Sequence, residues 1–311
     1  MDTVLITGGS GLVGTSLTKK LLARGYRVII FSRNPRPSSV SNLTYAKWNP
    51  EEGEIDEDAL QSADYIIHLA GAGVAEKRWS NARKKEIRQS RVKSGSLIIS
   101  FLRKNTHRAK KIVSASAIGW YGADSSIPNP IPFTEDFLPS NDFLGETCQQ
   151  WEQSILPATD LGIPLVVLRT GIVLSNHGGA LKEFLNPLRF GFATVLGSGK
   201  QMISWIHIHD LTNMYIEAME KKEYVGVYNA ASPDPASNKR FIVTLAKQLK
   251  GRYHTTIPIP EFILKIAMGE MSIEILKSTT VSCNKIIQAG FAFEFPTLES
   301  AIEHLVTHRE V

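Results

Sequence analysis

Short apolar runs alternate with longer amphipathic stretches from the first residues of the chain onward. The runs have the length and composition of buried parallel β-strands: Val4 to Ile6, Arg27 to Phe31, Leu43 to Ala46, Tyr65 to Leu69, Lys111 to Ala115 and Leu165 to Leu168. Helical periodicity marks the stretches Ser16 to Ala23, which Gly25 closes, Ser80 to Lys104 and Glu146 to Thr159. This alternation predicts an α/β fold, a doubly wound parallel sheet with helices on both faces.

The pattern changes after Leu174. Shorter apolar runs, Trp205 to Ile208 and Val227 to Ala230, mix with helical stretches, and prolines become frequent. We therefore expect residues 1–174 to form the sheet domain, with some later segments returning to it. Residues 175–311 are expected to form a smaller C-terminal α+β lobe.

Composition narrows the class of protein. The chain has 311 residues, of which 43% are hydrophobic and 21% charged, as in folded globular proteins. Its two cysteines, Cys148 and Cys283, indicate neither a disulfide framework nor a zinc site. No apolar run approaches the roughly 20 residues of a membrane-spanning helix. Because the first strand begins at Thr3, with no room for a signal peptide before it, we expect a cytoplasmic protein without membrane association.

The net charge of +5 is unevenly distributed. The segment Lys77 to Lys111 holds 13 Lys or Arg residues and a single acidic residue, Glu86. Such a stripe can attract a nucleotide, a polyphosphate or nucleic acid. The alternative is a solvated helix face, which apolar Ile87 and Ile98 favour because they supply a core side. Since aromatic residues are not interleaved with the charges, no nucleic-acid partner is expected.

The segment Thr7-Gly8-Gly9-Ser10-Gly11-Leu12-Val13-Gly14 lies between the first strand and the first helix. Its glycines follow G-x-x-G-x-x-G, with an overlapping G-x-G-x-x-G that starts at Gly9. Gly8 permits a tight turn, Gly11 lets the backbone approach a pyrophosphate, and Gly14 allows the helix to pack closely on the strand. This predicts a Rossmann domain that binds a dinucleotide through Gly8, Ser10, Gly11, Leu12, Val13 and Gly14.

The end of the second strand selects between NAD and NADP, because an acidic residue there binds the ribose hydroxyls of NAD. Here Phe31 is followed by Ser32 and Arg33 instead. A guanidinium forms charge-assisted bonds with a 2′-phosphate, so Ser32 and Arg33 predict NADP(H) as the cofactor. The alternative is that Arg33 lies in solvent.

Further short motifs occur in a characteristic order: His68-Leu69-Ala70-Gly71, Arg78-Trp79, Ser90-Arg91-Val92, Ser114 to Gly122, Trp151-Glu152, Leu168-Arg169-Thr170-Gly171, Ser204 to Ile208, Gly269-Glu270-Met271, Lys285 and Ala289-Gly290-Phe291. Over nearly its whole length the chain resembles the atypical extended short-chain dehydrogenases/reductases, a group also described as NAD-dependent epimerase/dehydratase-like oxidoreductases. The resemblance implies a Rossmann domain followed by a substrate lobe. It also implies cofactor contacts at Leu69, Ala70, Gly71, Arg91, Thr170, Gly171 and Val173.

The resemblance fails at one position. Typical relatives exchange a proton with the substrate through a Tyr-x-x-x-Lys pair. At the equivalent helix this chain has Phe143 or Leu144 in place of the tyrosine, and Thr147 or Cys148 in place of the lysine. Neither alignment restores an acid–base pair.

Two polar residues are the remaining catalytic candidates. By resemblance, Ser116 occupies the serine position of the family and could orient a carbonyl or hydroxyl. Tyr121 follows in the loop after the fifth strand and could bring a hydroxyl near the nicotinamide. The alternatives are a strand-end serine bonded to backbone and an aromatic packing wall.

His207 and His209 alternate along a predicted strand and so share one face. A metal site would need a third ligand that the sequence does not provide, so no metal is expected. Hydrogen bonding around Asp210, or capping of the next helix, is the expected role.

The sequence thus predicts an NADP(H)-dependent oxidoreductase or epimerase that acts on a small substrate, with an anionic one as an option. The alternative is a non-catalytic NADP(H)-binding sensor or regulatory protein. Substrate, reaction direction and oligomeric state are left open.

Overall fold

The computed structural model describes residues 1–308 of the chain. Its largest element is a sheet with the strand order β12-β7-β6-β5-β1-β2-β3-β4. All neighbouring strands are parallel except β3 and β4. The strands are β1 (Thr3–Thr7), β2 (Arg27–Ser32), β3 (Leu43–Asn49), β4 (Glu54–Ile55), β5 (Tyr65–His68), β6 (Lys111–Ala117), β7 (Leu165–Thr170) and β12 (Gly226–Ala230).

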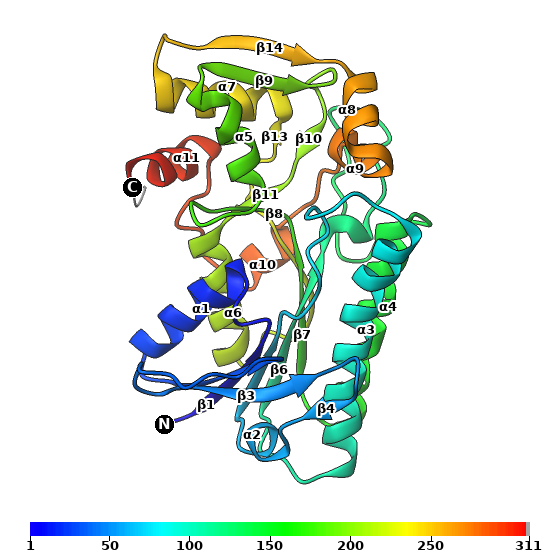
Figure 1. Cartoon of the computed structure of the whole chain (residues 1–311), viewed down its shortest axis with the longest axis vertical. Coiled ribbons are helices and arrows are strands. Elements are labelled where there is room, and N and C mark those ends of the chain that lie inside the picture. Colours follow the sequence, from blue (N-terminus) through cyan, green and yellow to red (C-terminus); the bar gives the residue numbers. More distant parts are fainter. Residues whose placement is uncertain (309–311) are drawn as a thin grey trace.

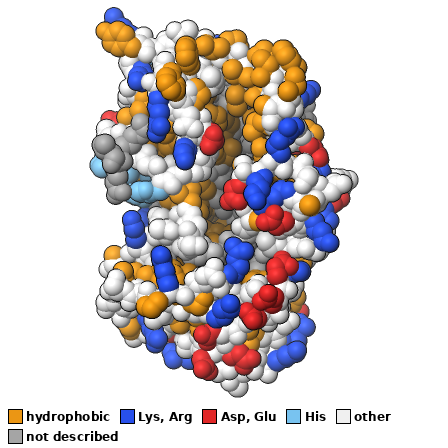
Figure 2. Space-filling model, viewed as in Figure 1, with side chains coloured by type: hydrophobic (Ala, Val, Ile, Leu, Met, Phe, Trp, Pro, Cys, Tyr) orange, Lys and Arg blue, Asp and Glu red, His pale blue; other side chains and the backbone are white. Residues whose placement is uncertain are grey.

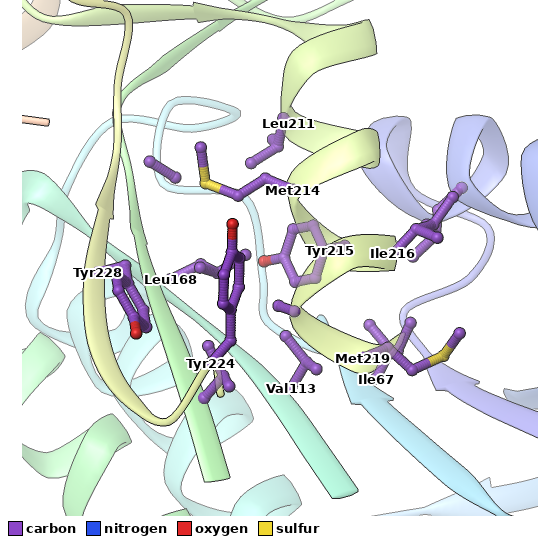
Figure 3. Packing of buried hydrophobic residues seen from close by; sticks show 14 of the residues in the cluster. Ile67, Val113, Leu168, Leu211, Met214, Tyr215, Ile216, Met219, Tyr224 and Tyr228 are labelled. Carbon is purple, nitrogen blue, oxygen red and sulfur yellow. The ribbon is translucent and has the colours of Figure 1, made fainter. Parts of the chain in front are cut away.

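Helices cover both faces of this sheet (Figure 1). On one face, α1 (Leu12–Ala23) and α6 (Ile208–Glu220) bury Leu17, Leu211 and Met214 against the strands. Figure 3 shows Tyr215 of α6 among these side chains. On the other face lie α3 (Asn81–Lys104) and α4 (Phe143–Ile155), with Ile98 in the second core. The predicted doubly wound α/β fold is confirmed.

The structure differs from the sequence prediction at the first helix. Residues Leu12 to Thr15 are helical, so α1 begins inside the glycine loop, whereas periodicity placed its start at Ser16. Gly11 is the N-cap of α1 in an extended conformation, which explains why the helix can start so early. The loop and the helix N-terminus are therefore one structural unit.

The chain returns to the large sheet after residue 174. Strand β12 pairs with β7 along its whole length, and α6 packs on the same face as α1. Between β7 and β12, β8 (Ile172–Leu174) pairs in parallel with β11 (Trp205–His207). Segments on both sides of residue 174 thus contribute to the sheet domain.

The remaining elements build a smaller lobe beyond the carboxyl ends of the strands (Figure 1). Its own core joins Leu181, Trp205, Phe241 and Leu298. The elements of this lobe are α5 (Ala180–Arg189), β9 (Phe192–Leu196), β10 (Met202–Ile203), β13 (Ala236–Ser237), α7 (Asn238–Lys250), β14 (Thr255–Ile259), α8 (Glu261–Met268), α9 (Ser272–Leu276) and α11 (Leu298–Thr307). Helix α10 (Asn284–Gln288) returns to the large sheet, where Ile286 joins the core beneath α6. Helix α2 (Glu57–Gln61) lies at the opposite end of the molecule. The C-terminal region is therefore a smaller, separate domain.

None of the helices in residues 1–308 combines the length and the apolar character needed to cross a membrane.

Candidate functional site

The glycine loop makes a tight connection between β1 and α1. Gly8 has a left-handed φ of +69°, and a Cβ at this position would lie 2.9 Å from the carbonyl carbon of Leu69. A Cβ on Gly14 would lie 2.4 Å from the carbonyl oxygen of Gly8. The N–H of Gly11 donates to that same oxygen at 3.0 Å. The close approach requires glycine, and it leaves the first-turn N–H groups of α1 directed toward an anion.

A cavity of about 220 Å³ opens beside this loop. It lies at the carboxyl ends of β1, β5, β6 and β7, where the strand order reverses between β1 and β5. Doubly wound sheets bind ligands at this switch point. The lining residues are Gly8, Gly11, Leu12, Val13, Gly14, Leu69, Ala115, Ser116, Thr170, Leu211 and Tyr215.

The cavity brings together eight of the residues predicted from the sequence, namely Gly8, Gly11, Leu12, Val13, Gly14, Leu69, Ser116 and Thr170. Others adjoin it in the chain without lining it: Ser10, Ala70, Gly71, Gly171 and Val173. Ser32 and Arg33 lie at the end of β2. Sequence reasoning missed Ala115, Leu211 and Tyr215. The spacing of four residues between Leu211 and Tyr215 on α6 is the signal that could have found those two.

The strand ends beside the cavity are held by a buried hydrogen-bond network. The Thr7 hydroxyl oxygen accepts from the N–H groups of Leu69 at 3.1 Å and Ala70 at 3.2 Å. Its own proton therefore goes to Nδ1 of His68, 2.8 Å away, and the other ring nitrogen faces Ser94 at 3.3 Å. Burial, together with the charge of Arg91, lowers the pKa of His68 to about 3. A neutral histidine thus fixes the loop that starts at Leu69.

Arg91 supports this loop from behind and does not line the cavity. Its guanidinium donates to the carbonyl oxygens of Ala72 at 3.0 Å and Ile87 at 2.8 Å. The same group lies 4.8 Å from the Trp151 ring centroid, in cation–π contact. A Cβ on Gly71 would approach its central carbon to 3.0 Å. Arg91 therefore packs against Gly71 and braces the loop, and its expected contact with the cofactor stays a prediction.

Opposite the glycine loop, Arg169 organises a buried polar cluster. It forms a two-pronged ion pair with Glu152, at 2.9 and 3.0 Å, and donates to the Tyr121 hydroxyl at 3.1 Å. The Trp120 ring lies 3.6 Å from its guanidinium carbon. Ser116 donates to Glu152 at 2.6 Å. Charge and hydrogen-bonding groups thus compensate one another inside the domain.

This cluster holds both catalytic candidates. Tyr121 has no exposed surface, and its hydroxyl donates to Asn229 at 2.7 Å, a geometry that favours the packing alternative. Burial raises its pKa to about 12. Ser116 lines the cavity, and its hydroxyl donates to Glu152. The alternative expected from the sequence was a hydrogen bond to the backbone.

At the start of α4, the four positions that could match the tyrosine and the lysine of typical relatives hold no acid–base pair. Phe143 packs edge to face against Trp79 at 4.9 Å, and the Thr147 hydroxyl donates to the Phe143 carbonyl at 2.6 Å. Cys148 is buried against the Ala117 carbonyl, and burial raises the pKa of its thiol to about 12. These positions therefore serve packing and helix structure.

A glycine loop at a helix N-terminus, placed at the switch point of a doubly wound sheet, defines a dinucleotide-binding protein of the Rossmann class. The chain belongs to the NAD dependent epimerase/dehydratase family, whose profile matches residues 4–231. A second profile, a domain of unknown function (DUF1731), matches residues 259–305. The family resemblance seen in the sequence is thereby confirmed.

The relatives extend this likeness to the whole chain. Epimerase family protein YfhF of Bacillus subtilis is 35% identical over 308 residues, which cover 99% of each chain. Human epimerase family protein SDR39U1, solved with NADPH, is 29% identical, with a TM-score of 0.87 and coverage of 98% of this chain and 99% of that chain. UDP-glucuronic acid 4-epimerase of Bacillus cereus, solved with UDP-glucuronic acid and NAD, is 18% identical with a TM-score of 0.78, covers 99% of each chain and shares the fold.

Proposed function

We propose that this protein is an NADP(H)-dependent oxidoreductase or epimerase that acts on a small substrate, an anionic one included, between its two domains. The observation that carries the proposal is the cavity at the switch point, built on the glycine loop. The human relative solved with NADPH supports it, because that protein matches nearly the whole chain. When bound, the nicotinamide supplies the hydride donor or acceptor.

The preference for NADP(H) rests on cations at the end of β2. Arg33 follows directly after Ser32, the last residue of the strand, and Ser32 pairs in register with Lys47 of β3. The Lys47 ammonium donates to the Arg33 carbonyl at 3.2 Å, which places a second cation beside Arg33, although Lys47 also pairs with exposed Glu54 at 3.6 Å. Arg36, by contrast, lies over the Tyr45 ring at 5.5 Å. Ser32, Arg33 and Lys47 would therefore hold a 2′-phosphate.

Ser116 is the residue we assign to the substrate oxygen. Its proton goes to Glu152, which Arg169 holds in an ion pair, so the serine presents a lone pair to the cavity. A lone pair accepts a hydrogen bond from a substrate hydroxyl and thereby orients it. Because the positions of the family's tyrosine and lysine carry Phe143 or Leu144 and Thr147 or Cys148, the proton itself would pass to water or to another group of the substrate.

The alternative function is a non-catalytic NADP(H)-binding sensor. The start of α4 motivates it, because neither Phe143 nor Leu144, the two candidates for the tyrosine position, can exchange a proton, and the Phe143 ring packs against Trp79. Under this hypothesis cofactor binding itself is the signal, and Ser116 has a structural role.

We propose no nucleic-acid partner, because carboxylates pair with much of the basic segment. Buried Arg83 contacts Glu76 and Glu86, and other members pair with acidic residues far away in the sequence. These pairs are Lys84 with Glu270, Arg88 with Glu146, Lys93 with Glu51, Arg108 with Asp64, and Lys110 with Asp2 and Asp64. These ion pairs involve six of the 13 cations and reduce the positive charge that the segment can offer to a phosphate backbone.

Calorimetry with NADPH and NADH tests the cofactor. The double variant Arg33→Ala, Lys47→Ala should lose about 10- to 100-fold in NADPH affinity, as expected for charge-assisted bonds of about 1.5–3 kcal/mol. Its NADH affinity should stay the same, and Arg36→Ala is the matched control that should retain NADPH binding. Equal binding of both cofactors by the wild-type protein would contradict the assignment.

Turnover distinguishes the enzyme from the sensor. A panel of carbonyl compounds, alcohols and sugar nucleotides is screened by the absorbance of reduced nicotinamide, and by product analysis for epimerisation, which leaves the cofactor unchanged overall. Ser116→Ala should reduce turnover of any substrate found while NADPH affinity is retained. NADPH binding without turnover of any compound supports the sensor.

A further inference from the structure

Three histidine side chains from two helices meet where the C-terminal helix packs beside the start of α6. His207 is the N-cap of α6, His209 lies in its first turn, and His304 lies on α11. One ring nitrogen of each lies within 4.8 Å of the others. The ring centroids are 4.9, 5.0 and 5.0 Å apart, close to an equilateral triangle. The third imidazole, which the sequence did not reveal, is therefore present.

The surrounding structure fixes the two helices relative to each other. Buried Asp210 accepts hydrogen bonds from the N–H groups of Glu294 at 2.8 Å and Phe295 at 3.1 Å, directly before α11. The Phe295 ring lies 4.0 Å from the His207 ring and closes one side of the cluster. Asp234 accepts from the Leu298 N–H at 2.9 Å at the start of α11. The three rings are thus held on a pre-organised framework.

The cluster is open to solvent on one side. His207 has no exposed surface, whereas His209 and His304 are both partly exposed. Figure 2 shows histidine side chains at the molecular surface. An ion can therefore enter from solvent past the two outer rings and reach the buried one.

We propose that His207, His209 and His304 form a binding site for Zn²⁺ or a related borderline transition metal. Imidazole nitrogen is a preferred ligand of these ions, and three such ligands plus water complete a tetrahedron. With metal–nitrogen bonds of about 2.0–2.1 Å, the nitrogens would stand roughly 3.4 Å apart. The observed separations require shifts of about 1 Å, which rotation of the partly exposed rings of His209 and His304 can supply.

Proton positions determine what the ion displaces. Nδ1 of His207 accepts the His209 N–H at 3.0 Å, so the neutral ring carries its proton on Nε2, which faces Nδ1 of His304 at 3.2 Å. For Nε2 to bind the metal, its proton moves through solvent to Nδ1, with no net release. The His209 N–H then loses its acceptor. The bond between His207 and His304 is lost as well, so two hydrogen bonds are exchanged for three metal–nitrogen bonds.

A nearby cation limits the affinity. The Lys20 ammonium donates to the His209 carbonyl at 3.1 Å and to Asn213 at 2.8 Å, and its charge opposes a divalent ion. We therefore expect weaker binding than at a closed structural zinc site. Because the ligands come from α6 of the sheet domain and α11 of the smaller lobe, a bound ion would join the two domains independently of the cofactor.

Calorimetric titration of the untagged chain with zinc chloride tests the site. We expect one ion per chain, and at least tenfold weaker binding for His209→Ala and for His304→Ala. His254→Ala is the matched control, because its ring bonds to the Gly251 carbonyl outside the cluster and is dispensable for the ion. His207→Ala is avoided, since loss of the buried helix cap could unfold the protein.

Two further measurements distinguish a variant that has lost metal binding from one that has lost its fold. Co²⁺ should give the visible absorption of a tetrahedral nitrogen site in the wild-type protein and in His254→Ala, but not in His304→Ala. Zinc should raise the melting temperature of the same two proteins only. Zinc binding by His304→Ala with wild-type affinity, or no saturable binding by the folded wild-type protein, would overturn the proposal.

Discussion

The two sides of the cavity are built in different ways. On the side of the glycine loop, the backbone forms the site, and the close contact between Gly14 and Gly8 involves residues of one short segment. On the opposite side, a buried ion pair of Arg169 and Glu152 organises side chains, and Ser116 joins it from another strand. The first side depends on the absence of side chains. The second depends on the mutual compensation of buried charges.

This difference indicates which side of the cavity suits a constant ligand and which side suits a variable one. A backbone site that requires glycine binds a part that all dinucleotides share, the pyrophosphate. A site made of side chains can be rebuilt for another substrate, because Ser116 or the residues at the start of α4 can change without moving the loop. The loop side is thus suited to hold a dinucleotide of any kind, while the side chains on the Arg169 side can change with the substrate.

The largest expected effect comes from breaking the buried charge pair. In Glu152→Ala, the Arg169 guanidinium stays buried without its carboxylate, and the loss of one partner of such a pair costs about 3–5 kcal/mol. The free energy of unfolding, measured by urea denaturation, should fall by this amount. Arg169 is 3% exposed, so solvent cannot replace the lost partner.

A matched control separates charge from packing. Arg24 and Glu220 form an ion pair at the surface, with exposed side chains, so Glu220→Ala should change the free energy of unfolding by less than about 1 kcal/mol. Similar losses in the two variants would mean that burial does not determine the strength of the Arg169 pair.

The next largest effect is expected in the glycine loop. Gly14→Ala places a methyl group 2.4 Å from the Gly8 carbonyl oxygen, and such overpacking costs about 1–3 kcal/mol. Relief of the clash must separate α1 from the loop. The free energy of NADPH binding should therefore fall by more than the free energy of unfolding. Calorimetry and urea denaturation on the same variant measure the two losses.

Gly122→Ala is the control for this substitution. A Cβ there would meet the Ser140 hydroxyl at 3.5 Å, an ordinary contact. Its stability and NADPH affinity should match those of the wild-type protein. If Gly14→Ala binds NADPH normally, the loop does not need the close approach that the structure shows.

The same contrast explains what the sequence could predict. The sheet, the glycine loop and the lining residues near it follow from local patterns, since a glycine motif between strand and helix involves neighbours in the chain. The partners of Tyr121 and the third histidine could not be foreseen, because Asn229 lies 108 positions from Tyr121, and His304 lies 97 positions from His207. No local periodicity connects such residues. The cation–π contact of Arg91 with Trp151 could not be foreseen for a similar reason, because it depends on how α3 packs on α4.

The smallest of these effects concerns acidic pH and the loop side of the cavity. Burial lowers the pKa of His68 to about 3 in the folded protein, whereas the same side chain has a pKa of about 6.5 in the unfolded chain. Between these two pH values, His68 is protonated in the unfolded chain but neutral in the folded protein. Stability from this residue is therefore complete above about pH 6.5 and is lost as the pH falls. Between pH 7 and pH 5 the loss is about 2 kcal/mol.

His68→Gln, which cannot titrate, should be less stable at pH 7 but should show a correspondingly smaller fall in the free energy of unfolding between pH 7 and pH 5. Urea denaturation at both values measures the difference, and the buried His207, whose lowered pKa acts in the same direction, contributes equally to both proteins. Equal slopes for the two proteins would show that His68 is charged in the folded state, and the Thr7 network would then need another proton arrangement.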